Sequence, residues 1–169
     1  SSIRRGVGAH PHRGFETVTI SYEGSVEHHD NKGNHGIIGP GDVQWMTAAS
    51  GILHKEYHEK EFSESGGILH MIQLWVNLPK SEKMSEPKYQ TLLKENMGAF
   101  KLDNNQGKVS IIVGEFNGIK GPASTFTNIN IYNINLKNYG KTILKEPGNF
   151  NTGILVLKGE VKINENHTC

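Results

Sequence analysis

Hydrophobic and polar positions alternate with a period of two along much of this chain, which is the pattern of β-strands that bury one face. Gly, Pro, Asn and Asp, the residues that favour tight turns, separate these runs. The pattern predicts a hairpin over residues 15–30 and strands over residues 43–46, 52–57, 68–78, 109–113, 126–136 and 154–163. Short strands at this spacing, with no convincing helix among them, predict an all-β sandwich or barrel.

Residues 80–100 break the alternation. After Pro87, the run KYQTLLKEN spaces Tyr89, Leu92 and Leu93 as a helix would. We interpret this segment as a linker that contains a short helix or turn. We therefore predict an N-terminal metal-binding barrel over residues 1–90, a linker with a possible short helix over 91–106, and the start of a C-terminal barrel over 107–169.

A weak internal repeat favours two barrels in tandem. Shifting the chain by 135 residues aligns residues 22–26 with residues 157–161, and keeps a glycine in register. The same shift places His10 on Lys145 and His12 on Pro147, neither of which replaces a histidine ligand. We expect the second barrel to be incomplete and to bind no metal.

Composition narrows the possible partners. The 18 basic and 17 acidic residues are scattered along the chain, whereas nucleic acid binding needs clustered cations. No apolar run is long enough to cross a bilayer, and the single cysteine, Cys169, has no partner for an internal disulfide. We expect a cytoplasmic monomer, and, from its start at Ser1 and its end after a strand-like run, a segment of a longer protein.

Two short motifs carry the candidate chemistry, His10-Pro11-His12 and His54-Lys55-Glu56. In an extended backbone residues i and i+2 point to the same face, so each motif presents two ligands to one ion. If the two strands face each other inside a barrel, three imidazole nitrogens and one carboxylate oxygen meet. This set suits Fe(II), Mn(II), Ni(II), Cu(II) or Zn(II), and leaves positions open for water or substrate.

Other residues compete for a place in such a site. Glu16, four residues after His12, is a rival of Glu56 for the fourth ligand. His28 and His29 are adjacent and face opposite ways, and His28 is the better candidate for the wall of the pocket. We interpret the remaining histidines as surface or packing residues: His35, His58, His70 and His167.

The strand that follows the turn at Pro40-Gly41-Asp42 carries three residues whose role has two possible interpretations. Trp45, Met46 and Thr47 either line a substrate pocket or fill the barrel, and large apolar side chains in strands more often fill a core.

The runs HPHRGFETV (10–18), PGDVQWMTA (40–48) and GILHKE (51–56) occur together and in this order. With IQLWVNLP (72–79), they closely resemble the pirin family of the cupin superfamily, over about the first ninety residues and more loosely from Gly107 onward. The resemblance implies tandem jelly-roll-type cupin barrels with one metal, commonly iron, in the first barrel. Carried over by motif, the ligands are His10, His12, His54 and Glu56, and Glu16 is not the usual ligand.

Some pirins are similar in activity to quercetin 2,3-dioxygenases, which open the central ring of a flavonol with O2 and release carbon monoxide. The resemblance therefore implies a flavonol-like substrate at one divalent metal, Fe(II) first, with Ni, Mn, Cu or Zn as alternatives. Glu56 would be a ligand or the catalytic base that accepts the hydroxyl proton. Other pirins look like non-enzymatic, iron-dependent regulators that bind protein partners. A third alternative is a metal-stabilised barrel with an unknown substrate.

Overall fold

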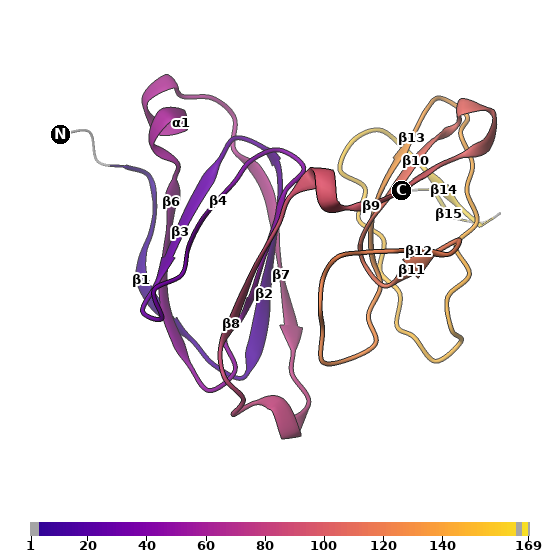
Figure 1. Ribbon diagram of the computed structural model, residues 1–169. Helices are drawn as coiled ribbons and strands as arrows, with labels where there is room; N and C mark the ends of the chain where they lie inside the picture. Colours follow the sequence, from indigo (N-terminus) through magenta and orange to yellow (C-terminus); the bar gives the residue numbers. More distant parts are fainter. Residues whose placement is uncertain (1–3, 165–166, 169) are drawn as a thin grey trace.

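The computed structural model describes residues 4–164 and 167–168. Its N-terminal part is a barrel made of two facing four-stranded sheets, and a C-terminal lobe with smaller sheets lies beside it (Figure 1). The first sheet contains, in spatial order, β1 (Gly6–His12), β6 (Ile52–His58), β3 (Val26–Asp30) and β4 (His35–Ile38). The second sheet contains β7 (His70–Asn77), β2 (Phe15–Glu23), β5 (Val43–Thr47) and β8 (Lys88–Leu92). All strand pairs in both sheets are antiparallel.

The two central strands of the second sheet, β2 and β5, are buried on both faces. On its inner face, Thr19 accepts a hydrogen bond from Gln73, whose amide also reaches Glu56 of the first sheet. On its outer face, Val18, Ile20, Val43 and Trp45 pack against Ile112 and Val113 of β10 in the C-terminal lobe. This explains why residues 16–21 of β2 are all buried. Trp45 therefore fills the contact between barrel and lobe, while Met46 packs inside the barrel with Ala48 and Ile52.

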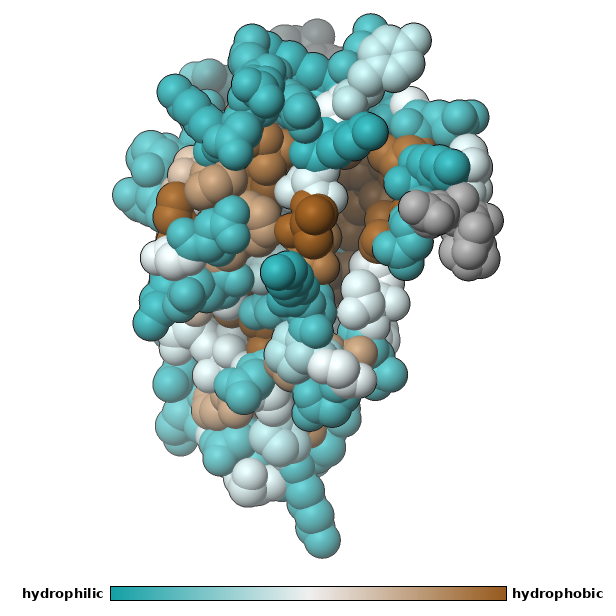
Figure 2. Space-filling model, turned by 90° about the vertical axis from the view of Figure 1, so that its right-hand side faces the viewer, coloured by the Kyte–Doolittle hydropathy of each residue, from teal (hydrophilic) through white to brown (hydrophobic). Residues whose placement is uncertain are grey.

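The C-terminal lobe is built on a sheet of β13 (Ile131–Leu136), β10 (Gly107–Val113) and β9 (Gly98–Lys101). Two short pairs accompany it, β11 (Glu115–Phe116) with β12 (Ile119–Lys120), and β14 (Lys162–Ile163) with β15 (His167–Thr168). Its own core contains Leu102, Val109, Ile111 and Phe116. Other apolar side chains of the lobe are exposed, and Figure 2 shows brown, hydrophobic side chains on this side of the molecule. The most exposed are Tyr139, Ile143 and Leu155.

Helical structure is confined to short turns in the described ranges. The α-helix α1 (Lys60–Ser65) begins where the Glu59 carboxylate accepts hydrogen bonds from the backbone N–H groups of Glu61 and Phe62. Single 3-10 turns occur at η1 (Lys80–Glu82), η2 (Lys94–Asn96) and η3 (Asp103–Asn105). The all-β prediction is confirmed, although α1 was not expected. None of these helices has the length or hydropathy to cross a bilayer.

Three predictions about strands need correction. The helix-like spacing after Pro87 is misleading, because residues 88–92 form strand β8 and pair with β5; only Lys94–Asn96 forms a helical turn. Residues 126–130 are not part of β13. The predicted strand at 154–163 is wrong except for its last two residues, so one half of the proposed repeat is irregular. Alternation favours a strand only where a neighbour supplies hydrogen bonds, and no described residue pairs with 154–161.

Candidate metal centre

The pairing of β1 with β6 brings the two metal-binding motifs side by side in one sheet. His10 lies directly opposite His54, and His12 is opposite Ile52. Between Val7 and His10 the register shifts by one residue, so that two residues of β1 face one residue of β6, as in a β-bulge. Without this extra residue Ala9 would face His54. The motifs were expected on facing strands; they are instead neighbours in the first sheet.

Three imidazoles gather at this point. The ligand nitrogens of His10, His12 and His54 all lie within 4.8 Å of one another. His12 and His54 are buried, and the Nε2 atom of each has no hydrogen-bond partner among the described residues. Leaving buried polar atoms unpaired is costly, and native proteins rarely do so without a reason. A divalent transition-metal ion would satisfy both nitrogens, so this donor set fits such an ion.

A backbone carbonyl determines which ring nitrogen of His10 carries the proton. Nδ1 of His10 lies 2.7 Å from the carbonyl oxygen of Gly8. Only an N–H group can donate to a carbonyl, so Nδ1 carries the proton and Nε2 keeps its lone pair. Gly8 belongs to the bulge of β1, so the same irregularity sets both the direction and the tautomer of His10.

A chain of hydrogen bonds through β3 fixes the tautomer of His54. His28 Nε2 donates to Asp30 Oδ2 at 3.2 Å, which leaves His28 Nδ1 as an acceptor. His54 Nδ1 lies 3.3 Å from that atom and donates to it, so the lone pair of His54 is on Nε2. Backbone N–H groups of Lys32 and Asn34 in turn hold Asp30 at 2.9 and 3.0 Å. His28, expected only as a wall of the pocket, therefore orients a predicted ligand.

Burial favours the neutral form of His12, His28 and His54. It lowers the pKa of His54 to about 3, with further lowering from His10, His28 and His12. Burial, followed by the nearby His10, also lowers the pKa of His12. Burial lowers the pKa of His28 against the opposing effect of Asp30. Neutral imidazole is the form that binds a metal, so the lowered pKa values of His12 and His54 favour metal binding at neutral pH.

Glu56 belongs to a second group, with His28 and His54, whose ligand atoms also lie within 4.8 Å of one another. The two groups share His54, and Glu56 is in the group without His10 and His12. Glu56 is 7% exposed, and its two oxygens accept hydrogen bonds from Gln44 at 2.6 Å and from Gln73 at 3.2 Å.

Aromatic donors orient both of these glutamines. The Tyr89 hydroxyl donates to Gln44 Oε1 at 2.9 Å, and Trp75 Nε1 donates to Gln73 Oε1 at 3.1 Å. With their oxygens occupied in this way, both amides turn their N–H groups toward the carboxylate of Glu56. The HxH and HxE spacings gave no sign of these four residues. The signal for Gln44 was available, because it is a polar residue at an inward position of an apolar strand.

Tyr89, on the edge strand β8, packs closely against the first sheet. Its ring stacks on His28 with centroids 4.5 Å apart, and burial raises its pKa to about 12. Gly36, which lies opposite His28, has no room for a side chain, because a Cβ there would collide with the Tyr89 hydroxyl. Glycine at this position is thus needed for the close approach of Tyr89.

Glu16, the rival ligand, faces away from the three histidines. It alternates along β2 with the inward-facing Thr17 and Thr19, and therefore shares the outer face with Val18. It is 2% exposed and accepts a hydrogen bond of 2.6 Å from Thr47 Oγ1. Glu16 thus lies on the face of the second sheet that packs against the lobe, away from the three histidines.

Two aromatic rings border the cluster on its open side. Trp75 is 65% exposed and lies 4.7 Å from Phe15 between ring centroids. The ring of His12 contacts both, at 5.7 Å from Trp75 and 5.2 Å from Phe15. An accessible aromatic surface therefore begins directly beside a candidate ligand.

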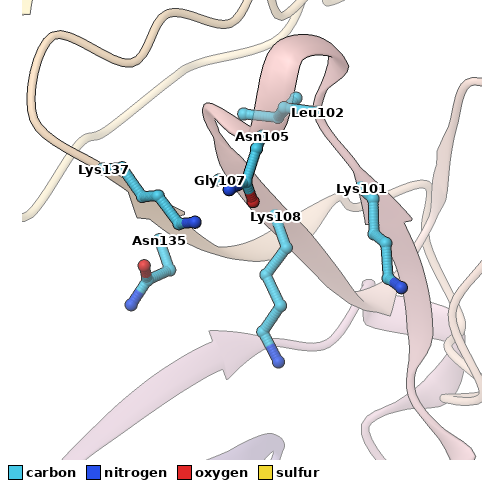
Figure 3. A pocket seen from close by; sticks show the side chains of 7 residues that line it. All are labelled: Lys101, Leu102, Asn105, Gly107, Lys108, Asn135 and Lys137. Atoms are coloured by element: carbon cyan, nitrogen blue, oxygen red, sulfur yellow. The ribbon is translucent and has the colours of Figure 1, made fainter.

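The C-terminal lobe offers a different chemistry. A hollow of about 550 Å³ there is lined by Lys101, Leu102, Asn105, Gly107, Lys108, Asn135 and Lys137 (Figure 3). These residues supply ammonium and amide groups, and none of them supplies an imidazole, thiolate or carboxylate. The metal-ligand chemistry described above thus belongs to the barrel.

Two facing antiparallel sheets with histidines gathered on the inner face of one of them define a barrel of the cupin type. The sequence profile of the family described as Pirin matches residues 1–76. This match to the pirin family over the first 76 residues confirms the resemblance seen in the motifs.

Several known proteins are similar to this chain over most of its length. A Pseudomonas aeruginosa protein named as a putative quercetin 2,3-dioxygenase is 50% identical over 162 residues, which are 96% of this chain and 57% of that protein. Pirin-1 of Arabidopsis thaliana is 38% identical over 94% of this chain and 53% of its own length. The crystal structure of quercetin 2,3-dioxygenase from Acinetobacter baumannii matches with a TM-score of 0.75 at 48% identity, covering 78% of this chain and 46% of that one. The chain spans about half the length of these relatives.

Proposed function

We propose that the barrel holds one divalent transition-metal ion through His10, His12, His54 and Glu56, and acts as a metal-dependent oxidoreductase of the quercetin 2,3-dioxygenase type. The observation that carries this proposal is the pair of buried Nε2 atoms of His12 and His54 that lack hydrogen-bond partners among the described residues. The names of the relatives supply the reaction class.

A bound ion would supply Lewis acidity toward a substrate oxygen and, if redox-active, electrons toward O2. By family resemblance the first candidate is Fe(II). Ni(II), Mn(II), Cu(II) and Zn(II) suit the same imidazole and carboxylate donors. The hydrogen bonds from Gly8 and His28 would keep the Nε2 atoms of His10 and His54 directed at the ion.

Glu56 is proposed as the fourth ligand or as the base that accepts the flavonol hydroxyl proton. Its two oxygens accept hydrogen bonds from two amide N–H groups, which fix the orientation of the carboxyl group that would accept the proton. The hydrogen bond from Gln73, at 3.2 Å, is longer than the one from Gln44, at 2.6 Å. Glu56 Oε2, which accepts the longer hydrogen bond from Gln73, can therefore give up that bond to a metal ion or a proton at the lower cost in free energy.

The aromatic rings beside His12 are proposed to receive the substrate. A flavonol is flat and aromatic, and offset stacking on an exposed ring suits such a molecule. Trp75, at 65% exposure, offers that ring, and Phe15 supports it from behind.

The domain division also remains a proposal: barrel over residues 1–90, linker over 91–106 and the start of a metal-free second barrel over 107–169. The separate core of the C-terminal lobe supports a second unit, but that core includes Leu102, and strand β9 of the lobe also lies inside the proposed linker. Against a sharp boundary at residue 90, strand β8 of the barrel continues to Leu92.

The test is aerobic turnover of quercetin by protein loaded with Fe(II) or Ni(II), followed by O2 consumption and release of carbon monoxide. We expect activity in the wild type and a loss of about a hundredfold or more in His12→Ala and Glu56→Gln. His70→Ala is the matched control, because His70 is a half-buried histidine of β7 outside both ligand groups.

Absence of turnover by metal-loaded wild-type protein would contradict the proposed activity. The regulatory alternative would then gain support if a protein partner bound the metal-loaded form and not the metal-free form. Equal activity in wild type and His12→Ala would contradict the proposed ligands.

A further inference from the structure

Another set of potential ligands lies on the outer face of the first sheet, formed by Glu27 and His29 of β3 and His35 of β4. Side chains alternate along β3, so Val26 and His28 are buried in the barrel while Glu27 and His29 are turned away from its interior. The sheet therefore separates this group from the metal centre inside the barrel.

The hairpin of β3 and β4 pairs the two histidines. His29 lies directly opposite His35, and their ring centroids are 4.4 Å apart. Directly opposite residues on antiparallel strands have Cβ atoms about 4.5–5.5 Å apart, which lets two imidazoles reach one ion. Asp30 holds the turn between the strands by accepting hydrogen bonds from the backbone N–H groups of Lys32 and Asn34.

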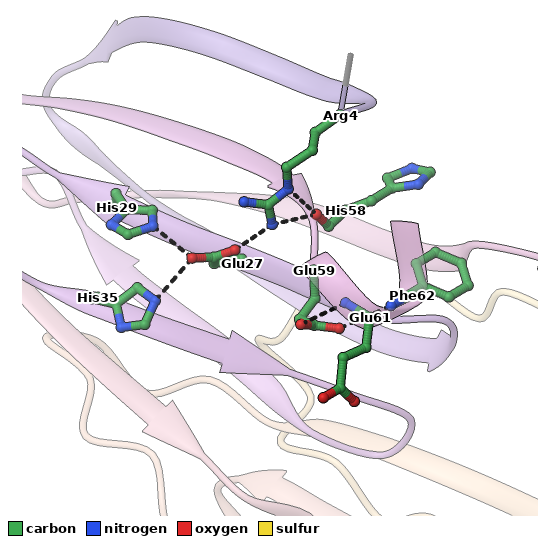
Figure 4. A network of polar contacts seen from close by, with 8 residues as sticks. All are labelled: Arg4, Glu27, His29, His35, His58, Glu59, Glu61 and Phe62. Carbon is green, nitrogen blue, oxygen red and sulfur yellow. Dashed lines mark hydrogen bonds and ion pairs between the residues drawn. The ribbon is translucent and has the colours of Figure 1, made fainter. Parts of the chain in front are cut away.

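The three donors already converge. Nε2 of His29 lies 2.8 Å from Glu27 Oε1, and Nε2 of His35 lies 3.2 Å from the same oxygen (Figure 4). All three ligand atoms are within 4.8 Å of one another. Zinc bonds to nitrogen and oxygen are about 2.0–2.2 Å long, so small side-chain rotations would bring all three onto one ion. The side chains of His29 and His35 are 40% and 50% exposed, which leaves them room to rotate.

Arg4 holds the carboxylate in position. Its guanidinium pairs with Glu27 Oε2 and also donates to the carbonyl oxygen of His58, from Nε at 3.1 Å and from Nη2 at 2.6 Å (Figure 4). This arrangement leaves Oε1 for the two histidines. Hydrogen bonding to Arg4, and next to His29, lowers the pKa of Glu27 to about 2, so the carboxylate is charged at neutral pH.

We infer that Glu27, His29 and His35 form a second divalent transition-metal site on the outside of the barrel. Two imidazoles and one carboxylate suit Zn²⁺, Cu²⁺ or Ni²⁺, and three protein ligands leave further positions to water. The site is open to solvent and has the positive charge of Arg4 nearby, so it binds more weakly than the buried centre. It does not depend on the function proposed above.

The experiment is calorimetric titration of the metal-free chain with Zn²⁺, together with measurement of bound zinc at saturation. We expect two ions per wild-type chain. The His29→Gln/His35→Gln variant should keep only the tighter ion, and His54→Ala should keep only the weaker one. His58→Gln, which alters a neighbouring histidine outside the three donors, should keep both.

Two results would overturn this inference: saturation of the wild type by a single ion that His29→Gln/His35→Gln retains, or two ions in His29→Gln/His35→Gln. A single ion in the wild type that His29→Gln/His35→Gln loses would count against the buried centre and leave the outer site intact, so the two proposals fail separately. Because the variants could misfold, a second measurement uses the wild-type protein alone. Zn²⁺ beyond the first equivalent should shift the imidazole ¹⁵N resonances of His29 and His35, and unchanged resonances would contradict the site.

Discussion

The barrel and the C-terminal lobe are both built from short antiparallel strands, but they bury different kinds of side chain. Every buried polar or charged residue in the described part of the chain lies between His12 and Glu56, in the strands of the barrel and the turns that join them. Most of these side chains face the interior of the barrel, whereas Glu16 and Thr47 lie on the outer face of the second sheet. The buried side chains of the lobe are apolar. Because burial of polar groups is unfavourable unless they are paired, their concentration in one region marks where structure has been adapted to chemistry.

The two regions are nevertheless interdependent. The outer face of the second sheet gives Val18, Ile20, Val43 and Trp45 to a core that also contains Ile112 and Val113 of the lobe. Apolar burial at this contact offsets the cost of the polar interior on the other side of the same sheet. The comparison therefore assigns chemistry to the barrel and part of the barrel's stability to the lobe.

The largest expected effect tests this assignment at the contact itself. Trp45 is fully buried between barrel and lobe, so Trp45→Ala should lower the free energy of unfolding by about 3–5 kcal/mol. The control is Ile143→Ala in the lobe, where the side chain is 76% exposed and the cost should be within about 0.5 kcal/mol. Urea unfolding measures the free energy of unfolding of both variants, with circular dichroism of the backbone as the signal because one variant lacks a tryptophan. If both variants lost similar free energy of unfolding, the contact between barrel and lobe would be no more important for stability than the exposed surface of the lobe.

The next effect concerns the residue shared by both ligand groups in the barrel. His54→Ala should lower affinity for the buried metal by at least about a hundredfold, or about 2.7 kcal/mol. His70→Ala should bind as the wild type does. Metal content after dialysis against a chelator of known affinity gives the comparison, and undiminished metal in His54→Ala would place the centre elsewhere.

A smaller effect is expected where His28 orients His54 without being one of the four proposed ligands. His28→Phe keeps an aromatic ring against Tyr89 but removes the acceptor for His54 Nδ1–H. We expect metal affinity to fall about tenfold to a hundredfold. In the metal-free protein, ¹⁵N shifts should show the Nδ1–H form of His54 in the wild type and a mixture of tautomers in the variant. An unchanged tautomer would show that His28 only fills space.

The spacing of residues within the two motifs predicted the four candidate ligands. The residues that surround these ligands are brought there by pairing between strands that are distant in the sequence. The HxH and HxE spacings point to a site because residues i and i+2 share a face of a strand, which the sequence displays directly. Gln44 and Gln73 reach Glu56, and Tyr89 reaches Gln44, only through the pairing of other strands, so the spacing of the HxH and HxE motifs does not point to them. The bulge that turns His10 toward His54 is equally invisible in the alternation of side chains.

The same limit explains the errors in the fold. Strand β8 was taken for a linker because both of its faces are used, with Tyr89 inside the barrel and Gln90 bonded to Ser124 of the lobe. That two-sided use hides the period of two. In the lobe, residues 154–161 have a strand-like composition but no described strand beside them, and composition alone does not make a strand.

The smallest expected effect concerns the outer face of the barrel, where polar residues are exposed as in the lobe. The pKa of Glu27 is lowered to about 2 from an ordinary value of 4.5, so its ion pairs favour the folded state above pH 4.5. This contribution should disappear as the pH falls from 4.5 toward 2. Because the network lies at the surface and is screened by salt, it should amount to about 1 kcal/mol or less.

Comparison of wild type with Glu27→Gln by urea unfolding at pH 7, 5, 4 and 3 measures this contribution in the metal-free chain. The wild type should be more stable at pH 7 and 5, and the difference should shrink at pH 4 and again at pH 3. The matched control is Glu115→Gln in the lobe, whose carboxylate is 4.0 Å from the Lys120 ammonium with both side chains mostly exposed. It should change stability little at any pH, because exposed pairs at this distance contribute almost nothing. A pH-independent loss in Glu27→Gln would mean that packing, and not charge, is what Arg4, His29 and His35 provide.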